Sequence, residues 1–155
     1  DAAFTAEVGE VSEIAHKLVE TTQGALFAGI AQMIAGNHIG DVSAAIQNYA
    51  ESRQFHVTRE YTGHGVGRAM HEGPQAPNYG VPGRGILLRA GMTIALEPML
   101  LVGTPYTRVL PDQWTVSSAD GSLTAHFEHT VAITENGPLI LTTQGDGSVL
   151  DGIWK

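Results

Sequence analysis

The chain has 155 residues and a mass of 16.4 kDa, which suits one compact domain. It has no cysteine, which excludes disulfides, thiolate zinc sites and cysteine nucleophiles and fits a reducing compartment. Sixteen acidic against eight basic residues give a net charge of −8, which argues against binding to nucleic acid. No apolar run reaches the roughly 18 residues of a membrane span, and no secretion-signal pattern opens the chain. We therefore expect a cytoplasmic protein.

Two helices are predicted in the first third of the chain. The first covers residues 12–35, with Ser12 as its N-cap and Gly36 and Asn37 as its stop signal. The second begins with Asp41 as N-cap and carries its apolar residues on one face. The apolar positions that define the buried face of the first helix are Ile14, Leu18, Thr22, Ala25, Leu26, Ile30 and Met33.

From about residue 56 onward the sequence favours short strands and turns. Residues 93–99 and 124–134 are the clearest strands, and the second alternates strictly between apolar and polar positions. Asn136 and Gly137 then form a turn into a further strand, residues 139–142. Two helices followed by a mostly antiparallel sheet predict an α+β fold with covering helices.

His64 stands in a Gly-His-Gly-Val-Gly segment, residues 63–67, where the glycines let other backbone or a ligand approach closely. The segment is not a dinucleotide-binding fingerprint, because Arg68 takes the place of the third glycine. His71 and Glu72 follow, without the second histidine of a zinc-protease helix motif. Taken alone, each histidine also fits a purely structural role.

Glu97 and Glu128 each lie on an otherwise apolar strand. A buried, unpaired carboxylate is unfavourable, so each needs a partner, either in a salt bridge or on a metal ion. One imidazole with several carboxylates suits a divalent ion such as Mn(II), Fe(II) or Co(II), and two carboxylates can bridge a pair. His126 and His129 lie near Glu128 in the sequence, and either could form a hydrogen bond that orients a metal ligand.

Four segments in order carry a resemblance to a known family: DAAFTAEVG (1–9), GHGVGRAMHEGP (63–74), GMTIALEPM (91–99) and DQWTVSSADGSLTAHFEHTVAIT (112–134). They resemble the pita-bread metallopeptidases and, within these, the type I methionine aminopeptidases. The short interval between His71 and Glu97 leaves no room for the helical insertion of type II enzymes. EPM and FEHTVAIT favour methionine aminopeptidases over prolidases and X-Pro aminopeptidases.

The resemblance implies a pita-bread fold and a site with two divalent metal ions, either Co, Mn, Fe, Zn or Ni. The implied metal ligands are Asp1, His64, Glu97 and Glu128, of which Asp1 and Glu128 bridge the two ions. A hydroxide held between the metals would attack the carbonyl that follows an N-terminal methionine.

The resemblance also implies roles for the residues around the metals. Glu97 would be the general base, and His71 would hydrogen-bond the substrate and stabilise the tetrahedral intermediate. Met70 and Trp114 align with residues that line the methionine pocket, where a thioether and an indole suit a sulfur-containing side chain.

One aspartate ligand and one histidine of the family pattern have no counterpart in residues 1–155. Asp41 and Asp112 do not replace the aspartate, because the first is expected to cap a helix and the second to form a turn. We therefore expect one incomplete pita-bread catalytic domain, residues 1–155, with its N-terminal part missing. A second chain, such as the N-terminal fragment of the same precursor, would supply that part. Residues 143–155 form a C-terminal tail beyond the resemblance.

The expected function is hydrolysis of the N-terminal methionine from nascent proteins and peptides, with the ribosome considered as a partner. Two alternatives remain open from the sequence. The first is an X-Pro aminopeptidase or prolidase of the same fold. The second is a pita-bread binding module or fragment that has lost catalysis.

Overall fold

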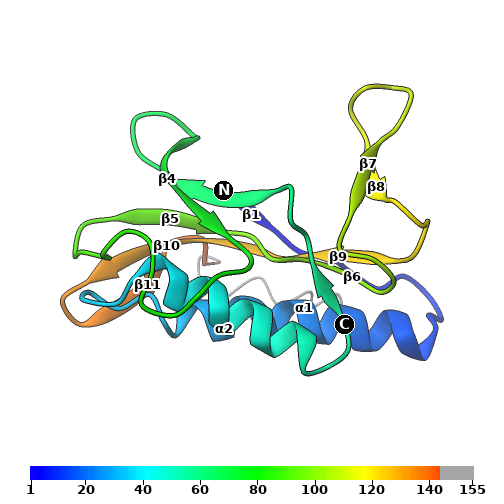
Figure 1. Cartoon of the computed structure of the whole chain (residues 1–155), viewed down its shortest axis with the longest axis horizontal. Helices are drawn as coiled ribbons and strands as arrows, with labels where there is room; N and C mark the ends of the chain where they lie inside the picture. Colours follow the sequence, from blue (N-terminus) through cyan, green and yellow to red (C-terminus); the bar gives the residue numbers. More distant parts are fainter. Residues whose placement is uncertain (144–155) are drawn as a thin grey trace.

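In the computed structural model, which describes residues 1–143, a curved antiparallel sheet is covered on one face by two helices (Figure 1). The helices are α1 (Glu13–Ile30) and α2 (Ile39–Glu51). Two hairpins project from the opposite face of the sheet, one at each end (Figure 1). The predicted α+β fold with covering helices is confirmed. Trp154 and the expected C-terminal tail beyond Thr143 lie outside the described residues.

Every strand pairing in the described part of the chain is antiparallel. The largest sheet has the order β1-β10-β5-β3-β4, with β11 also pairing with β10. The order β2-β6-β9 forms a second sheet, and β7 pairs with β8 in a projecting hairpin. The strands are β1 (Ala2–Ala3), β2 (His56–Val57), β3 (Thr62–Gly65), β4 (Glu72–Pro77), β5 (Thr93–Leu96), β6 (Met99–Leu101), β7 (Thr107–Val109), β8 (Val116–Ser118), β9 (Thr124–His126), β10 (Glu128–Thr134) and β11 (Gly137–Ile140).

Helix α1 begins as predicted and ends earlier. The Ser12 hydroxyl accepts a hydrogen bond from the backbone N–H of Ala15 at 3.3 Å, as an N-cap does. The prediction that the helix continues to residue 35 is wrong, because it ends at Ile30. The following turn is closed by the Asn37 side chain, which donates to the carbonyl of Gln32 at 3.0 Å. Ile14, which was predicted to lie on the buried face, is exposed.

Helix α2 corrects the prediction that Asp41 is its N-cap. The helix begins at Ile39 with His38 as N-cap, and Asp41 occupies its first turn. The Asp41 carboxylate accepts the backbone N–H of His38 at 2.7 Å and that of Gly83 at 2.8 Å. These backbone hydrogen bonds hold the pKa of Asp41 below its ordinary value. Asp41 therefore ties the start of the helix to the loop that follows β4.

The two long predicted strands are each broken, which corrects the predictions for residues 93–99 and 124–134. β5 and β6 are separated at Glu97 and Pro98, and β9 and β10 at Phe127. The breaks face each other, because the N–H of Phe127 donates to the carbonyl of Pro98 at 3.4 Å. Proline has no N–H to continue the ladder, so the strand pair passes there from one sheet into the next. β11 begins two residues earlier than predicted.

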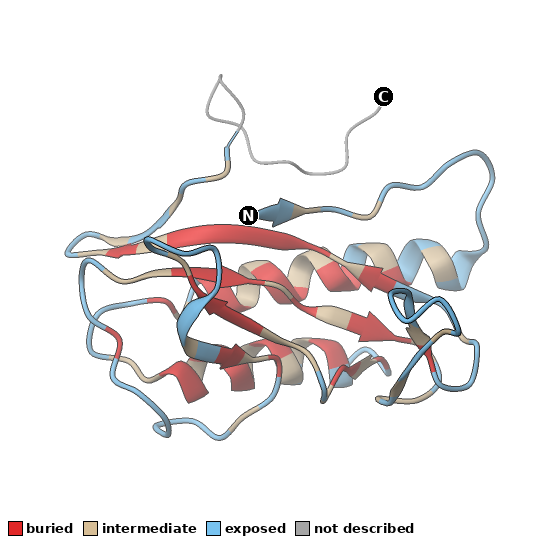
Figure 2. Cartoon of the chain, turned by 90° about the horizontal axis from the view of Figure 1, so that it is seen from above, coloured by how far each residue is buried: buried red, intermediate tan, exposed pale blue. Residues whose placement is uncertain are grey.

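The core lies between the helices and the main sheet, where buried residues cover the facing sides of both (Figure 2). Gly29 lets α1 pack closely: a Cβ there would lie 2.7 Å from Ile46 and 3.0 Å from Leu96. Among residues 1–143, neither helix combines the length and the apolar character that crossing a membrane requires. The helix layer thus supports one face of the sheet and leaves the opposite face to the projecting hairpins.

Candidate metal centre

His64 is held in the interior of β3 by glycines on both sides. A Cβ at Gly63 would lie 2.5 Å from the carbonyl oxygen of Ala95, and one at Gly65 would lie 2.2 Å from that of Gly73. Glycine is needed at both positions because neighbouring backbone approaches this closely. His64 Nδ1 lies 3.0 Å from the carbonyl oxygen of Gly65, which can only accept. The proton therefore resides on Nδ1, and Nε2 presents a lone pair to the site.

The Nε2 atom of His64 faces two carboxylates from distant parts of the chain. It lies 3.6 Å from Asp1 Oδ2 and 3.6 Å from Glu97 Oε1. Glu97 comes from the break between β5 and β6, and Glu128 opens β10. One ligand atom each from His64, Glu97 and Glu128 lie within 4.8 Å of one another, close enough to hold a metal ion. The structure thus brings together all four residues that the sequence suggested as ligands.

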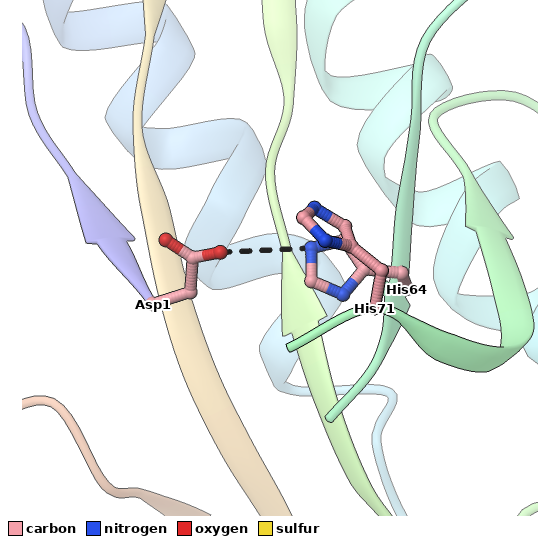
Figure 3. A group of neighbouring side chains, drawn as sticks. All are labelled: Asp1, His64 and His71. Carbon is pink, nitrogen blue, oxygen red and sulfur yellow. Dashed lines mark ion pairs between the residues drawn. The ribbon is translucent and has the colours of Figure 1, made fainter. Parts of the chain in front are cut away.

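A second group joins Asp1 and His64 to His71 (Figure 3). Ligand atoms of these three residues also lie within 4.8 Å of one another. The rings of His64 and His71 have centroids 4.2 Å apart. His71 is exposed, whereas His64 is buried, so His71 faces the approach to the site.

Burial dominates the electrostatics of the two glutamates. It raises the pKa of Glu97 to about 7, with a further contribution from the negative charge of Glu128. Burial also raises the pKa of Glu128. Glu128 Oε1 is buried without a hydrogen-bond partner. An unpartnered carboxylate oxygen, a second carboxylate and an imidazole lone pair form a donor set that fits a divalent cation.

The histidines on either side of Glu128 have different surroundings. His129 Nδ1 lies 2.8 Å from the hydroxyl of Thr142, and its ring contacts Phe27 of α1 at a centroid distance of 6.3 Å. His126 Nε2 instead lies 3.8 Å from Glu97 Oε2. Of the two, His126 is therefore the one beside the candidate ligands.

The loop between β3 and β4 carries Met70 and His71 and is closed by Glu72. The Glu72 carboxylate accepts the backbone N–H of Ala69 at 2.7 Å. A Cβ at Gly67 would meet this carboxylate within 3.0 Å, so a larger residue at that position would displace the Glu72 side chain. The sequence analysis did not assign a role to Glu72, because only the folded loop shows what it contacts.

The two residues aligned with the methionine pocket lie on separate projections of the open face. Met70 is 61% exposed on the β3–β4 loop, and Trp114 is 87% exposed on the β7–β8 hairpin. Both projections stand on the side of the sheet opposite the helices (Figure 1). Asp112 accepts the N–H groups of Trp114 at 3.1 Å and Thr115 at 2.9 Å. It therefore closes a turn, as predicted, and is not a ligand.

Asn78 is a buried residue near the site that the sequence analysis missed. It is 0% exposed, and its side-chain Nδ2 donates to the backbone carbonyl of Glu97 at 3.3 Å. In the sequence, Asn78 followed by Tyr79 and Gly80 has only the character of a turn, so no local signal identifies it.

Comparison with known proteins identifies the class. Residues 1–135 match the profile of metallopeptidase family M24, and the chain belongs to this family. The methionine aminopeptidase of Clostridium acetobutylicum is 51% identical over 142 residues, which are 92% of this chain and 57% of that protein. The chain therefore spans little more than half the length of this relative.

Solved structures give the same picture. The crystal structure of methionine aminopeptidase from Thermotoga maritima matches with a TM-score of 0.89 and 52% identity, covering 91% of this chain and 57% of that one. The prolidase from Pyrococcus horikoshii matches with a TM-score of 0.68 and 23% identity, covering 92% and 35%. The second match shows the shared fold alone. The predicted pita-bread fold is thereby confirmed, and the similarity to the methionine aminopeptidase is the greater of the two.

Proposed function

We propose that this chain carries the metal-binding part of a methionine aminopeptidase, which removes the N-terminal methionine from nascent proteins and peptides. The observation that carries the proposal is the convergence of Asp1, the half-buried Glu97 and the buried Glu128 on His64. The identity of about half with a methionine aminopeptidase over 92% of the chain supports the same reaction. The much lower identity with a prolidase makes the X-Pro alternative the weaker one.

In this proposal Asp1, His64, Glu97 and Glu128 would hold two divalent ions. The raised pKa values of Glu97 and Glu128 support it, because burial disfavours the charged form of each carboxylate and a bound cation would offset that cost. When bound, such ions polarise the scissile carbonyl and make water acidic enough to react near neutral pH. Which of Co, Mn, Fe, Zn or Ni occupies the site is a matter for measurement.

Glu97 is proposed as the general base. Its carboxylate lies at the candidate metal centre, with Oε1 3.6 Å from His64 Nε2, where it could accept a proton from a water molecule held there. The proton taken from the attacking water would reside on a Glu97 carboxylate oxygen before it passes to the new amino group. His71, exposed on the β3–β4 loop, would donate a hydrogen bond to the substrate and stabilise the negative charge that develops on the carbonyl oxygen.

Met70 and Trp114 are proposed to contact the methionine side chain. Their exposure on two projections of the open face supports this role, because a bound peptide would cover apolar surface that otherwise faces water. A thioether and an indole suit a sulfur-containing side chain.

We further propose that residues 1–155 are one incomplete catalytic domain. The remaining aspartate and histidine of the family pattern would come from the part of the relatives that residues 1–155 do not span. A cytoplasmic location and access to nascent chains at the ribosome would follow from the proposed activity.

The test is the metal content of the purified protein, followed by peptide hydrolysis. We expect two divalent ions and release of methionine from a Met-Ala peptide. Cleavage of an X-Pro peptide in preference to Met-Ala would favour the prolidase alternative. A purified protein without stoichiometric metal would favour a binding module or an inactive fragment.

A further inference from the structure

His126, the last residue of β9, has an unusual environment for a strand histidine. Its side chain is 36% exposed, yet its Nε2 atom is buried and has no hydrogen-bond partner. Glu97 Oε2 lies 3.8 Å from this atom. A buried ring nitrogen without a hydrogen-bond partner lowers stability, so its position needs an explanation.

The backbone of His126 is fixed on both sides. The hydroxyl of Thr5 accepts the His126 N–H at 2.9 Å and donates to the His126 carbonyl at 2.9 Å. On the other side, His126 pairs with Met99 of β6. The segment that follows Asp1 and the strand that follows Glu97 therefore both hold this residue in place.

The two oxygens of Glu97 face different histidines. Oε1 lies 3.6 Å from His64 Nε2, and Oε2 lies 3.8 Å from His126 Nε2. His64 Nε2 presents a lone pair, because its Nδ1 proton faces a carbonyl. His126 Nε2 is therefore the ring nitrogen available to donate a proton to Glu97. A shift of about 1 Å would bring this pair to the length of a charge-assisted hydrogen bond.

We propose that His126 is a positioning residue for Glu97: its Nε2–H donates to Oε2 and leaves Oε1 directed at the metal centre. The inference rests on the proposed function, since it concerns a carboxylate that binds metal. Ligating carboxylates are themselves commonly hydrogen-bonded, and loss of such a partner weakens metal affinity or activity by about 10–100-fold. Within residues 1–143 no ion pair joins His129 to Glu97, and His129 Nδ1 instead lies 2.8 Å from the Thr142 hydroxyl.

Three variants of the complete protein test the proposal: His126→Ala, His126→Gln and, as a matched control, Thr58→Val. Thr58 and His126 line the same cavity of about 190 Å³, and the Thr58 hydroxyl is likewise buried without a partner. The readouts are the Mn(II) dissociation constant by calorimetry and the visible spectrum of the Co(II) form. The unfolding midpoint of each variant establishes that it is folded.

We expect His126→Ala to weaken Mn(II) binding by about 10–100-fold and to alter the Co(II) spectrum. His126→Gln keeps an N–H donor and should recover most of the affinity, whereas Thr58→Val should match the wild type. Equal affinities and spectra for the wild type and His126→Ala would overturn this inference and leave the proposed function unaffected. A wild type that binds neither ion would overturn the proposed function and this inference with it.

Discussion

The helix layer and the region around the β5–β6 break differ in whether their buried polar groups have hydrogen-bond partners. In the helices, the hydroxyl of Thr22 donates to the Leu18 carbonyl at 2.7 Å, and that of Ser43 donates to the Ile39 carbonyl at 3.0 Å. Around the break, buried polar atoms lack partners. In the described part of the chain they are Thr58 Oγ1, Asn78 Oδ1, His126 Nε2 and Glu128 Oε1.

The four residues that carry these unpartnered atoms all contact residues 97–99. Thr58 donates its N–H to the Met99 carbonyl, and Asn78 donates to the Glu97 carbonyl. His126 and Glu128 lie beside the Glu97 carboxylate. Each unpaired group lowers stability by about 1–3 kcal/mol, and the two that lie beside the Glu97 carboxylate, on His126 and Glu128, indicate a ligand-binding site there. The helix layer stabilises the fold, and the break region holds the candidate metal centre.

The largest expected effect is that of Glu97→Gln on catalysis. Removal of the general base should lower the rate of methionine release from a Met-Ala peptide by about 100–10,000-fold. Stability should not fall, because the neutral amide avoids burial of a charge. The control is Glu135→Gln, an exposed acid in the turn before β11. A Glu97→Gln protein with wild-type turnover would remove Glu97 from the mechanism.

A core substitution in the helix layer should lower stability and leave metal binding unchanged. Leu26 of α1 is 1% exposed, and Leu26→Ala should lower the free energy of unfolding by about 2–5 kcal/mol. Metal stoichiometry of the folded protein should be unchanged. Val8→Ala, at a position 88% exposed, should change stability by less than about 0.5 kcal/mol. Urea unfolding and metal analysis provide the comparison, and loss of metal from folded Leu26→Ala would show that the two regions are coupled.

The pH dependence of stability should distinguish the regions further. Burial and the charge of Glu128 raise the pKa of Glu97 from 4.5 to about 7 in the folded protein. The folded state therefore binds this proton more tightly than the unfolded state, and stability falls as pH rises through that window. As the pH rises from about 4.5 to above 7, Glu97 should lower the free energy of unfolding of the metal-free protein by about 3 kcal/mol.

Urea unfolding of metal-free protein between about pH 5 and pH 8 measures this slope. Glu97→Gln should flatten it. Mn(II) should bind more tightly at the higher pH, because the ion competes with the proton. Stability that rises with pH to the same extent in both proteins would contradict the assignment.

The smallest expected effect concerns the β3–β4 loop. Glu72→Ala removes the acceptor for the Ala69 N–H and should loosen the loop that presents His71. We expect kcat/KM to fall about fivefold, equivalent to about 1 kcal/mol, with Mn(II) affinity unchanged. Glu72→Gln keeps an acceptor oxygen and should lose less. A large fall in Mn(II) affinity would instead place Glu72 within the metal centre.

Sequence reasoning succeeded where structure depends on neighbours along the chain. The Ser12 cap, the helical periodicity and the Asn136-Gly137 turn are local features, and each is found in the fold. It failed at Asp41, because aspartate suits both the N-cap and the first turn of a helix. It also failed at the strand breaks, since the alternation of residues 124–134 continues through Phe127.

By itself, the sequence determined that the chain has glycines on both sides of His64, a carboxylate in each of two apolar segments and no cysteine. Together with the family resemblance, it also selected Asp1, His64, Glu97 and Glu128 as a group. Only the tertiary structure decided which oxygen of Glu97 faces His64, and that His126 rather than His129 lies beside it. These contacts are set by the pairing of strands about thirty residues apart in the sequence and by the facing breaks at Pro98 and Phe127. Such long-range pairing cannot be predicted from preferences that depend only on neighbouring residues.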